Sequence, residues 1–149
     1  MNQIGKYSSE RNIQMLIYLL KQHNIRKVIA SPGTSNINFV ASVQFDDYFQ
    51  VYSCVDERSA AYMACGMAEE SGEPVVLTCT GATASRNYVP GLTEAYYRKI
   101  PVLAVTATQH LGRIGQNMQQ VLDRSIQMKD LANYSMQLTT IHSQEEWAA

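Results

Sequence analysis

Four short segments of small and polar residues could carry chemistry in this sequence. Each follows an apolar run and precedes a helical pattern: Ser31–Ser35, Asp56–Arg58, Thr80–Ala84 and Thr108–Gly115. Turns of this kind present free backbone N–H groups and small side chains to a ligand. None of them contains the GKS or GKT of a P-loop or a GxGxxG fingerprint, so these two nucleotide-binding motifs are excluded.

Glu57 is the most suggestive single residue. It follows Asp56, a predicted helix N-cap, so its carboxylate stands at a strand end and at the positive end of a helix dipole. Such a carboxylate has two interpretations, an acid that exchanges a proton with a ligand or ordinary favourable electrostatics at a helix start. Taken alone, the residue favours the second, because charged residues are common in a first helical turn.

The elements that must position these segments alternate between strand and helix. Strands are predicted over 27–31, 49–55, 74–80, 101–108 and 134–141, and helices over 13–20, 37–41, 57–70, a stretch around Pro90 and 119–131. Because strands separated by helices form βαβ units, we expect an α/β fold with a doubly wound, mainly parallel sheet. The sheet should have about five to six strands with helices on both faces. All four polar segments then follow strand ends, where such sheets bind ligands.

Composition and charge exclude several functional classes. The 149 residues are 46% hydrophobic, and 12 Lys+Arg against 13 Asp+Glu give a net charge of -1. This balance argues against a nucleic-acid partner or a membrane surface, which need a basic face, and no apolar run reaches the ~20 residues of a membrane span. The cysteines and histidines are scattered, so we expect neither a disulfide framework nor a metal site. A cytoplasmic protein with reduced thiols is the resulting expectation.

The C-terminal end carries a helix-start signal. Ser143 and Glu146 form a capping box, and the sequence stops at Ala149, before a helix could complete two turns. We therefore expect residues 1–149 to form a single domain that is the N-terminal part of a longer polypeptide. A frayed natural tail is the alternative.

Three segments taken together resemble a known family. They are SPGTSN at 31–36, the helical VDERSAAYMACGMAEE at 55–70, and TCTGATASRNYVPG at 78–91 continuing to PVLAVTAT at 101–108. In order and spacing they resemble the N-terminal pyrimidine-binding domain of thiamine-diphosphate-dependent enzymes. The most similar group is that of acetolactate synthase and 2-succinyl-5-enolpyruvyl-6-hydroxy-3-cyclohexene-1-carboxylate synthase.

The resemblance implies a catalytic role for Glu57. In that family the Glu of this motif hydrogen-bonds N1′ of the cofactor's aminopyrimidine and promotes the imino tautomer, which removes the thiazolium C2 proton. The activated cofactor then attacks a 2-oxo acid and takes up the electrons released by decarboxylation. The cofactor-binding residues implied besides Glu57 are Pro32, Gly33, Gly81, Ala82 and Asn87. The substrate or site-adjacent residues implied are Thr34, Ser35 and one glutamine, either Gln119 or Gln120.

The sequence departs from this family in two respects. The menaquinone-pathway synthase has an Arg in its SPGSRS turn that handles a substrate carboxylate, whereas Ser35 or Asn36 stands there in this chain. The sequence also lacks the GDG…NN motif, which in the family binds Mg²⁺ and the diphosphate on a separate C-terminal domain. We therefore expect half of a thiamine diphosphate site here, with Mg²⁺ only on a diphosphate-binding domain of the same or another chain.

The expected function is the pyrimidine-binding half of a lyase or transferase that decarboxylates a 2-oxo acid and can pass the carbanion to an acceptor. The resemblance implies a homodimer or higher oligomer, and this chain alone should be inactive. Two alternatives stay open: a naturally separate subunit of a split 2-oxo acid decarboxylase, and a non-catalytic α/β interaction module. Glu57 argues against the module.

Overall fold

The computed structural model describes residues 7–109, 111–121 and 128–138. Its centre is a parallel sheet of four strands in the order β2-β1-β3-β4. The strands are β1 (Lys27–Ala30), β2 (Gln50–Ser53), β3 (Val75–Cys79) and β4 (Val102–Thr106). Because β2 and β3 lie on opposite sides of β1, the sheet is doubly wound, as the sequence predicts, with its switch point between β1 and β3.

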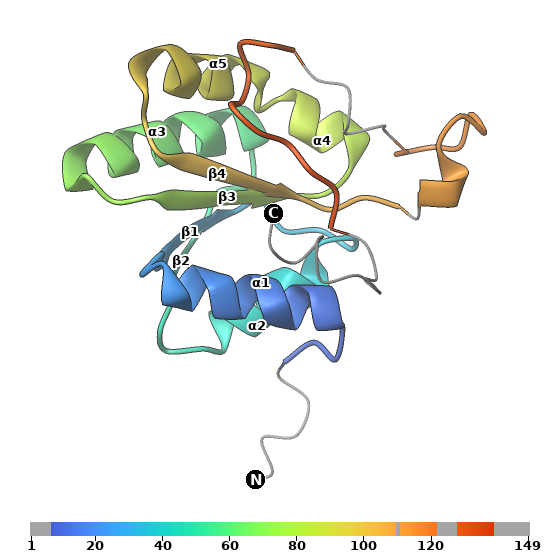
Figure 1. Ribbon diagram of the computed structural model, residues 1–149, viewed down its shortest axis with the longest axis horizontal. Coiled ribbons are helices and arrows are strands. Elements are labelled where there is room, and N and C mark those ends of the chain that lie inside the picture. Colours follow the sequence, from blue (N-terminus) through green and yellow to red (C-terminus); the bar gives the residue numbers. More distant parts are fainter. Residues whose placement is uncertain (1–6, 110, 122–127, 139–149) are drawn as a thin grey trace, which may run out of the picture.

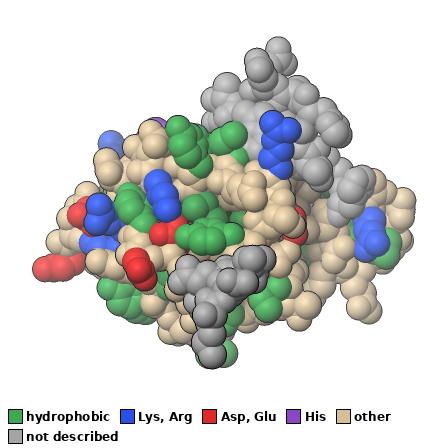
Figure 2. Space-filling model, turned by 90° about the horizontal axis from the view of Figure 1, so that it is seen from below, with side chains coloured by type: hydrophobic (Ala, Val, Ile, Leu, Met, Phe, Trp, Pro, Cys, Tyr) green, Lys and Arg blue, Asp and Glu red, His purple; other side chains and the backbone are tan. Residues whose placement is uncertain are grey.

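Helices cover both faces of this sheet (Figure 1). On one face lie α1 (Arg11–Gln22) and α2 (Ile37–Gln44), and on the other α3 (Glu57–Ser71), α4 (Ala82–Arg86) and α5 (Val89–Arg98). A short 3-10 helix, η1 (Leu111–Arg113), follows β4. Figure 2 shows the face with α1 and α2, on which acidic and basic side chains are interspersed with apolar ones. In the part of the chain that the structure describes, every helix is too short or too polar to cross a membrane.

Two hydrophobic layers enclose the sheet. Val28 and Val76 pack with side chains of α1 and α2, whereas Ile29 and Leu77 pack with the alanines of α3. Each such aliphatic side chain is fully buried, and burying one contributes about 1.5–3 kcal/mol. All of β3 is buried, so the continuous apolar run of this strand is explained by its central position.

The C-terminal part of the predicted fold differs from the structure. Residues 134–138 form no strand, and the remainder of the predicted strand at 134–141 lies outside the described residues. Gln137 reaches the loop after β4 through its side chain, donating from Nε2 to the Gln109 carbonyl at 3.5 Å. Alternating apolar residues do not indicate whether a neighbouring strand has free backbone groups, which explains the wrong prediction. The sheet therefore has four strands in the described region rather than five to six.

One helix prediction also needs correction. Residues 119–121 and 128–131 are turn or irregular backbone instead of helix, and 122–127 lie outside the described residues. The helix predicted around Pro90 is confirmed as α5, with Pro90 in its first turn, where a missing N–H costs no helical hydrogen bond, and the short α4 precedes it. The capping box at 143–146 lies outside the described residues as well.

Small residues allow α3 and α5 to approach closely. A Cβ atom on Gly91 would lie 2.5 Å from Cβ of Ala61, and Cys65 Sγ donates to the Gly91 carbonyl at 3.3 Å. Further along the helix pair, Arg98 of α5 forms an ion pair with Glu69 of α3. These contacts hold both ends of α5 against α3.

Candidate cofactor site

The turn after β1 is held by the buried side chain of Asn36. Its Oδ1 accepts a hydrogen bond from the Gly33 N–H at 2.8 Å, and its Nδ2 donates to the Ser31 carbonyl at 3.2 Å. Ser31 donates from its N–H to the Thr78 carbonyl at 2.8 Å and from Oγ to the Cys54 carbonyl at 2.7 Å. The turn is thereby fixed to the ends of both neighbouring strands. Asn36 is buried and hydrogen-bonded inside the turn, whereas Ser35 is exposed. Of the two residues compared with the arginine of the SPGSRS turn, Ser35 is therefore the one that a ligand can reach.

Gly33 packs directly against Thr80 in the turn after β3. A Cβ atom on Gly33 would lie 2.4 Å from Cγ2 of Thr80, so a side chain there would push the two turns apart. These are the turns that flank the switch point of the sheet. Pro32 and Gly33 also border an open groove of about 400 Å³, whose other lining residues are Ile37, Val40, Ala41 and Gln44.

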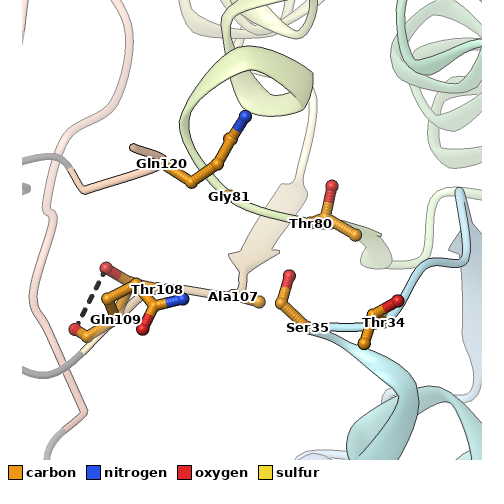
Figure 3. A pocket seen from close by; sticks show the side chains of 8 residues that line it. All are labelled: Thr34, Ser35, Thr80, Gly81, Ala107, Thr108, Gln109 and Gln120. Atoms are coloured by element: carbon orange, nitrogen blue, oxygen red, sulfur yellow. Dashed lines mark hydrogen bonds between the residues drawn. The ribbon is translucent and has the colours of Figure 1, made fainter. Parts of the chain in front are cut away.

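A cavity of about 270 Å³ opens at the carboxyl ends of β1, β3 and β4. Its lining comes from three loops and Gln120 (Figure 3): Thr34, Ser35, Thr80, Gly81, Ala107, Thr108, Gln109 and Gln120. None of these side chains is charged, and most carry a hydroxyl or an amide. The cavity can therefore exchange hydrogen bonds with an uncharged polar group.

Gln120, and not Gln119, lies at this cavity. Its Oε1 accepts from both the N–H and Oγ1 of Thr83 at 3.2 Å, and its Nε2 lies 3.0 Å from the same Oγ1. The Gln120 carbonyl oxygen would lie 3.2 Å from a Cβ atom on Gly81, so this glycine lets the loop approach. Gln119 is exposed and lines neither hollow.

Glu57 is half-buried in the first turn of α3. Asp56 caps this helix as predicted, accepting from the Ser59 N–H at 2.7 Å, and that hydrogen bond lowers the pKa of Asp56. Asn87, at the end of α4, donates from Nδ2 to Oε2 of Glu57 at 3.4 Å. Among the described residues, nothing donates a hydrogen bond to the other oxygen, Oε1. The carboxyl group is thus tethered through one oxygen and leaves the second for a ligand.

Tyr88, next to Asn87, is a core residue behind this site whose burial sequence reasoning missed. Its side chain is completely buried, and its hydroxyl makes no well-formed hydrogen bond within the described residues. Burial raises the pKa of Tyr88, with neighbouring Cys79 as the next cause, so the phenol stays neutral. The signal available in the sequence was the Asn-Tyr pair before Pro90, where a large ring precedes a helix start.

The structure brings the predicted site residues together in three places. The cavity contains Thr34, Ser35, Gly81 and Gln120. The groove is bordered by Pro32 and Gly33. Glu57 and Asn87 contact each other and line neither the cavity nor the groove. Ala82 is buried in α4 and also lies outside both linings. Over the described ranges, no three His, Cys, Asp or Glu side chains are grouped as metal ligands.

Known sequences match this chain over most of its length. The family described as "Thiamine pyrophosphate enzyme, N-terminal TPP binding domain" matches residues 12–128. The 2-succinyl-5-enolpyruvyl-6-hydroxy-3-cyclohexene-1-carboxylate synthase of Bacteroides thetaiotaomicron is 37% identical over 142 residues, covering 95% of this chain and 26% of that protein. The synthase of the same name from Porphyromonas gingivalis is 40% identical over 116 residues, covering 78% of this chain and 20% of that protein. The chain thus spans about a quarter of the length of these relatives.

Solved structures of low sequence identity share the fold. Benzoylformate decarboxylase from Polynucleobacter necessarius superposes with a TM-score of 0.73 at 20% identity, over 84% of this chain and 23% of that one. A thiamine diphosphate-dependent 4-hydroxybenzoylformate decarboxylase from Rhodococcus jostii gives a TM-score of 0.66 at 23% identity, over 74% of this chain and 20% of that one. The match over residues 12–128 decides the family: this chain belongs to the thiamine pyrophosphate enzymes and corresponds to their N-terminal TPP binding domain.

Proposed function

We propose that this chain is the pyrimidine-binding part of a thiamine-diphosphate-dependent enzyme that decarboxylates a 2-oxo acid and passes the resulting carbanion to an acceptor. The observation that carries this proposal is the one-sided tethering of Glu57. Its Oε2 is bound to Asn87 at 3.4 Å, while its Oε1 has no donor among the described residues. A half-buried carboxyl group with one available oxygen is suited to exchange a proton with a ring nitrogen.

The residues present fit the aminopyrimidine half of the cofactor. Ser31 Oγ is bonded to the Cys54 carbonyl, so the turn that contains Pro32 and Gly33 stands beside the strand end that leads into Glu57. This arrangement offers backbone and small apolar side chains for a flat ring and one acid for its nitrogen. When bound, thiamine diphosphate supplies an electron sink for the carbon–carbon bond that breaks on decarboxylation.

The chain's own residues would bind, orient and exchange a proton. Glu57, in the first turn of α3, would hold or release a proton at Oε1. Gly33 and Gly81 would keep the turns close enough to surround the ring, as their contacts with Thr80 and Gln120 support. The cavity at the carboxyl ends of β1, β3 and β4 would receive the substrate or the acceptor.

The diphosphate half of the cofactor would come from elsewhere. The described residues offer no grouped metal ligands, and the chain spans about a quarter of its relatives' length. We therefore place Mg²⁺ and the diphosphate on a further domain of the same polypeptide or of a second subunit, in a homodimer or higher oligomer. The isolated chain should then bind the cofactor weakly and show no turnover.

The cavity also bears on the acceptor. The name of these relatives suggests a synthase reaction, in which the carbanion is joined to an acceptor. The cavity of this chain, however, has Ser35 at the position where the SPGSRS turn of the menaquinone-pathway synthase has an arginine. Arg113 is exposed and donates to Gln109 Oε1 at 2.9 Å, from outside the lining. An uncharged lining favours an acceptor group that carries no carboxylate at this end.

Calorimetric titration tests the proposal. Thiamine diphosphate with Mg²⁺ is titrated into the full-length protein and into this chain, the latter alone and with a protein carrying a diphosphate-binding domain. Binding by the complete assembly, with weak or no binding by the chain alone, is the expected result. Absence of binding in every arrangement would contradict the proposal and favour a non-catalytic α/β module. Release of CO₂ from a panel of 2-oxo acids then identifies the substrate.

A further inference from the structure

Glu57 and Asn87 meet through a defined pair of atoms. Asn87 Nδ2 is a donor only, and the atom opposite it is Oε2 of Glu57 at 3.4 Å. Both side chains are half-buried, so neither is freely rotating in solvent. The geometry therefore distinguishes the two carboxyl oxygens, which are chemically equivalent in a free glutamate.

The position of Asn87 is fixed by its neighbours along the chain. Its N–H donates to the Ala84 carbonyl at 3.0 Å, and the completely buried Tyr88 follows it. One turn later Gly91 is pressed against Ala61 of α3, the helix that begins with Glu57. The backbone of Asn87, between α4 and α5, is thus fixed beside α3, the helix that carries the acid.

An N–H donor constrains where a proton can reside on the acid. An oxygen that accepts a hydrogen bond from Nδ2 cannot point an O–H group at that nitrogen, and the carbonyl-type oxygen of a neutral carboxyl group is its better acceptor. The contact therefore favours a neutral Glu57 that carries its hydrogen on Oε1. Loss of the donor would leave the carboxyl group free to rotate and to exchange its two oxygens.

We propose that Asn87 is a positioning residue that selects Oε1 of Glu57 as the oxygen that exchanges a proton with the ligand. This inference rests on the proposed function and refines the role expected of Asn87, since the residue acts through Glu57 and need not touch the cofactor. The proton passes from Oε1 to the ring nitrogen, and the carboxylate that remains keeps its hydrogen bond from Nδ2. A return of the proton to Oε1 restores the acid.

The test uses the complete enzyme with Asn87→Ala and the nearly isosteric Asn87→Asp. Asn38→Ala is a matched control, because Asn38 Nδ2 also donates to a carboxylate, that of Glu10, on a different surface. Three quantities are measured: thiamine diphosphate affinity by calorimetry, kcat, and the pH titration of the near-ultraviolet circular dichroism signal of the cofactor's imino tautomer.

We expect Asn87→Ala to bind the cofactor within about threefold of wild type and to lose about 10–100-fold in kcat, as for a misplaced reacting group. The midpoint of the circular dichroism titration should shift in both Asn87 variants, because the carboxyl group no longer presents one fixed oxygen to the ring nitrogen. Asn38→Ala should behave as wild type. A large loss of affinity with an unchanged midpoint would overturn the inference, because Asn87 would then bind the cofactor directly. Wild-type behaviour of both Asn87 variants would overturn it as well. If wild type itself binds no thiamine diphosphate, the proposed function fails together with the inference.

Discussion

Gly33 and Thr80 are in such close contact that a Cβ atom on Gly33 would lie 2.4 Å from Cγ2 of Thr80. The contact joins the turn after β1 to the turn after β3, the two strands between which the sheet changes direction. Because ligands of doubly wound sheets bind at this point, the glycine sets the width of the candidate site.

Gly33→Ala should therefore destabilise the protein by about 1–3 kcal/mol, the cost of overpacking a close contact. Thr80→Ser removes Cγ2, the atom that the new methyl group would meet, so the double variant should recover most of that loss. Chemical unfolding of the two single variants and the double variant measures the coupling between the positions. Equal destabilisation of Gly33→Ala with and without Thr80→Ser would show that the contact is not the cause.

Two helical glycines should respond to alanine in opposite directions. A Cβ atom on Gly66 in α3 would meet no atom of a neighbouring element within 4 Å, whereas a Cβ atom on Gly91 would meet Ala61 at 2.5 Å. Gly66→Ala should stabilise the chain by about 0.5–1 kcal/mol through helix propensity. Gly91→Ala should destabilise it by about 1–3 kcal/mol and separate α3 from α5. Thermal unfolding of the two variants checks both signs, and destabilisation by Gly66→Ala would indicate a neighbour that packs on this face.

Stability should depend on pH through a cluster around Asp46. Burial alone would raise the pKa of Asp46, but hydrogen bonds from Lys21 and Tyr7 outweigh it and lower that pKa. A lowered carboxyl pKa contributes stability above the unfolded value of about 3.9, and this contribution is lost as the pH falls through the folded value. Asp46→Asn should lower stability at neutral pH and flatten the acid side of the profile.

The same cluster predicts a loss on the alkaline side. Burial and the Asp46 carboxylate raise the pKa of Tyr7 to about 12. A raised pKa contributes stability that is complete below the ordinary value of about 10 and disappears as the pH rises through the folded value. Tyr7→Phe should remove this alkaline dependence and reduce, without abolishing, the acid-side dependence, because Lys21 still lowers the pKa of Asp46. Urea unfolding between pH 3 and pH 12 compares the two variants, and an unchanged alkaline limb in Tyr7→Phe would contradict the assignment.

The uncharged cavity predicts a change in acceptor preference. In the complete enzyme, Ser35→Arg should raise kcat/KM for carboxylate-bearing acceptors about tenfold or more over neutral ones, because a charge-assisted hydrogen bond replaces a hydroxyl. Arg113→Ala is the companion variant, since Arg113 donates to the lining residue Gln109 from outside. A preference for carboxylates in wild type that Arg113→Ala abolishes would mean that this arginine supplies the charge.

The strands and their polar ends could be predicted from the sequence. β1, β2, β3 and β4 lie within two residues of the predicted bounds, because apolar runs ended by Pro, Gly or Asp identify buried strands and the turns after them. Asp56 was found as an N-cap because its side chain acts within one helical turn. Local patterns of this kind suffice where the partner is close in sequence.

Contacts between distant segments could not be predicted in this way. Asn87 is 30 positions from Glu57, and its approach depends on the packing of Gly91 against Ala61. The choice between Gln119 and Gln120 likewise depended on which side chain reaches Thr83. The strand predicted at 134–141 is wrong in its described part, because alternating apolar residues do not show whether a neighbouring strand is available for pairing.

Proton exchange at C2 of thiamine diphosphate bound to the complete enzyme tests the proposed role of Glu57 most directly. This exchange, followed by quenched proton NMR after transfer to D₂O, requires no knowledge of the 2-oxo acid. Glu57→Gln keeps the shape of the side chain and removes the exchangeable carboxyl proton. Wild type should accelerate exchange over the free cofactor, and Glu57→Gln should lose about 10²–10⁴-fold, the usual contribution of a positioned acid or base. Equal exchange rates in wild type and Glu57→Gln, with the cofactor bound in both, would contradict this role.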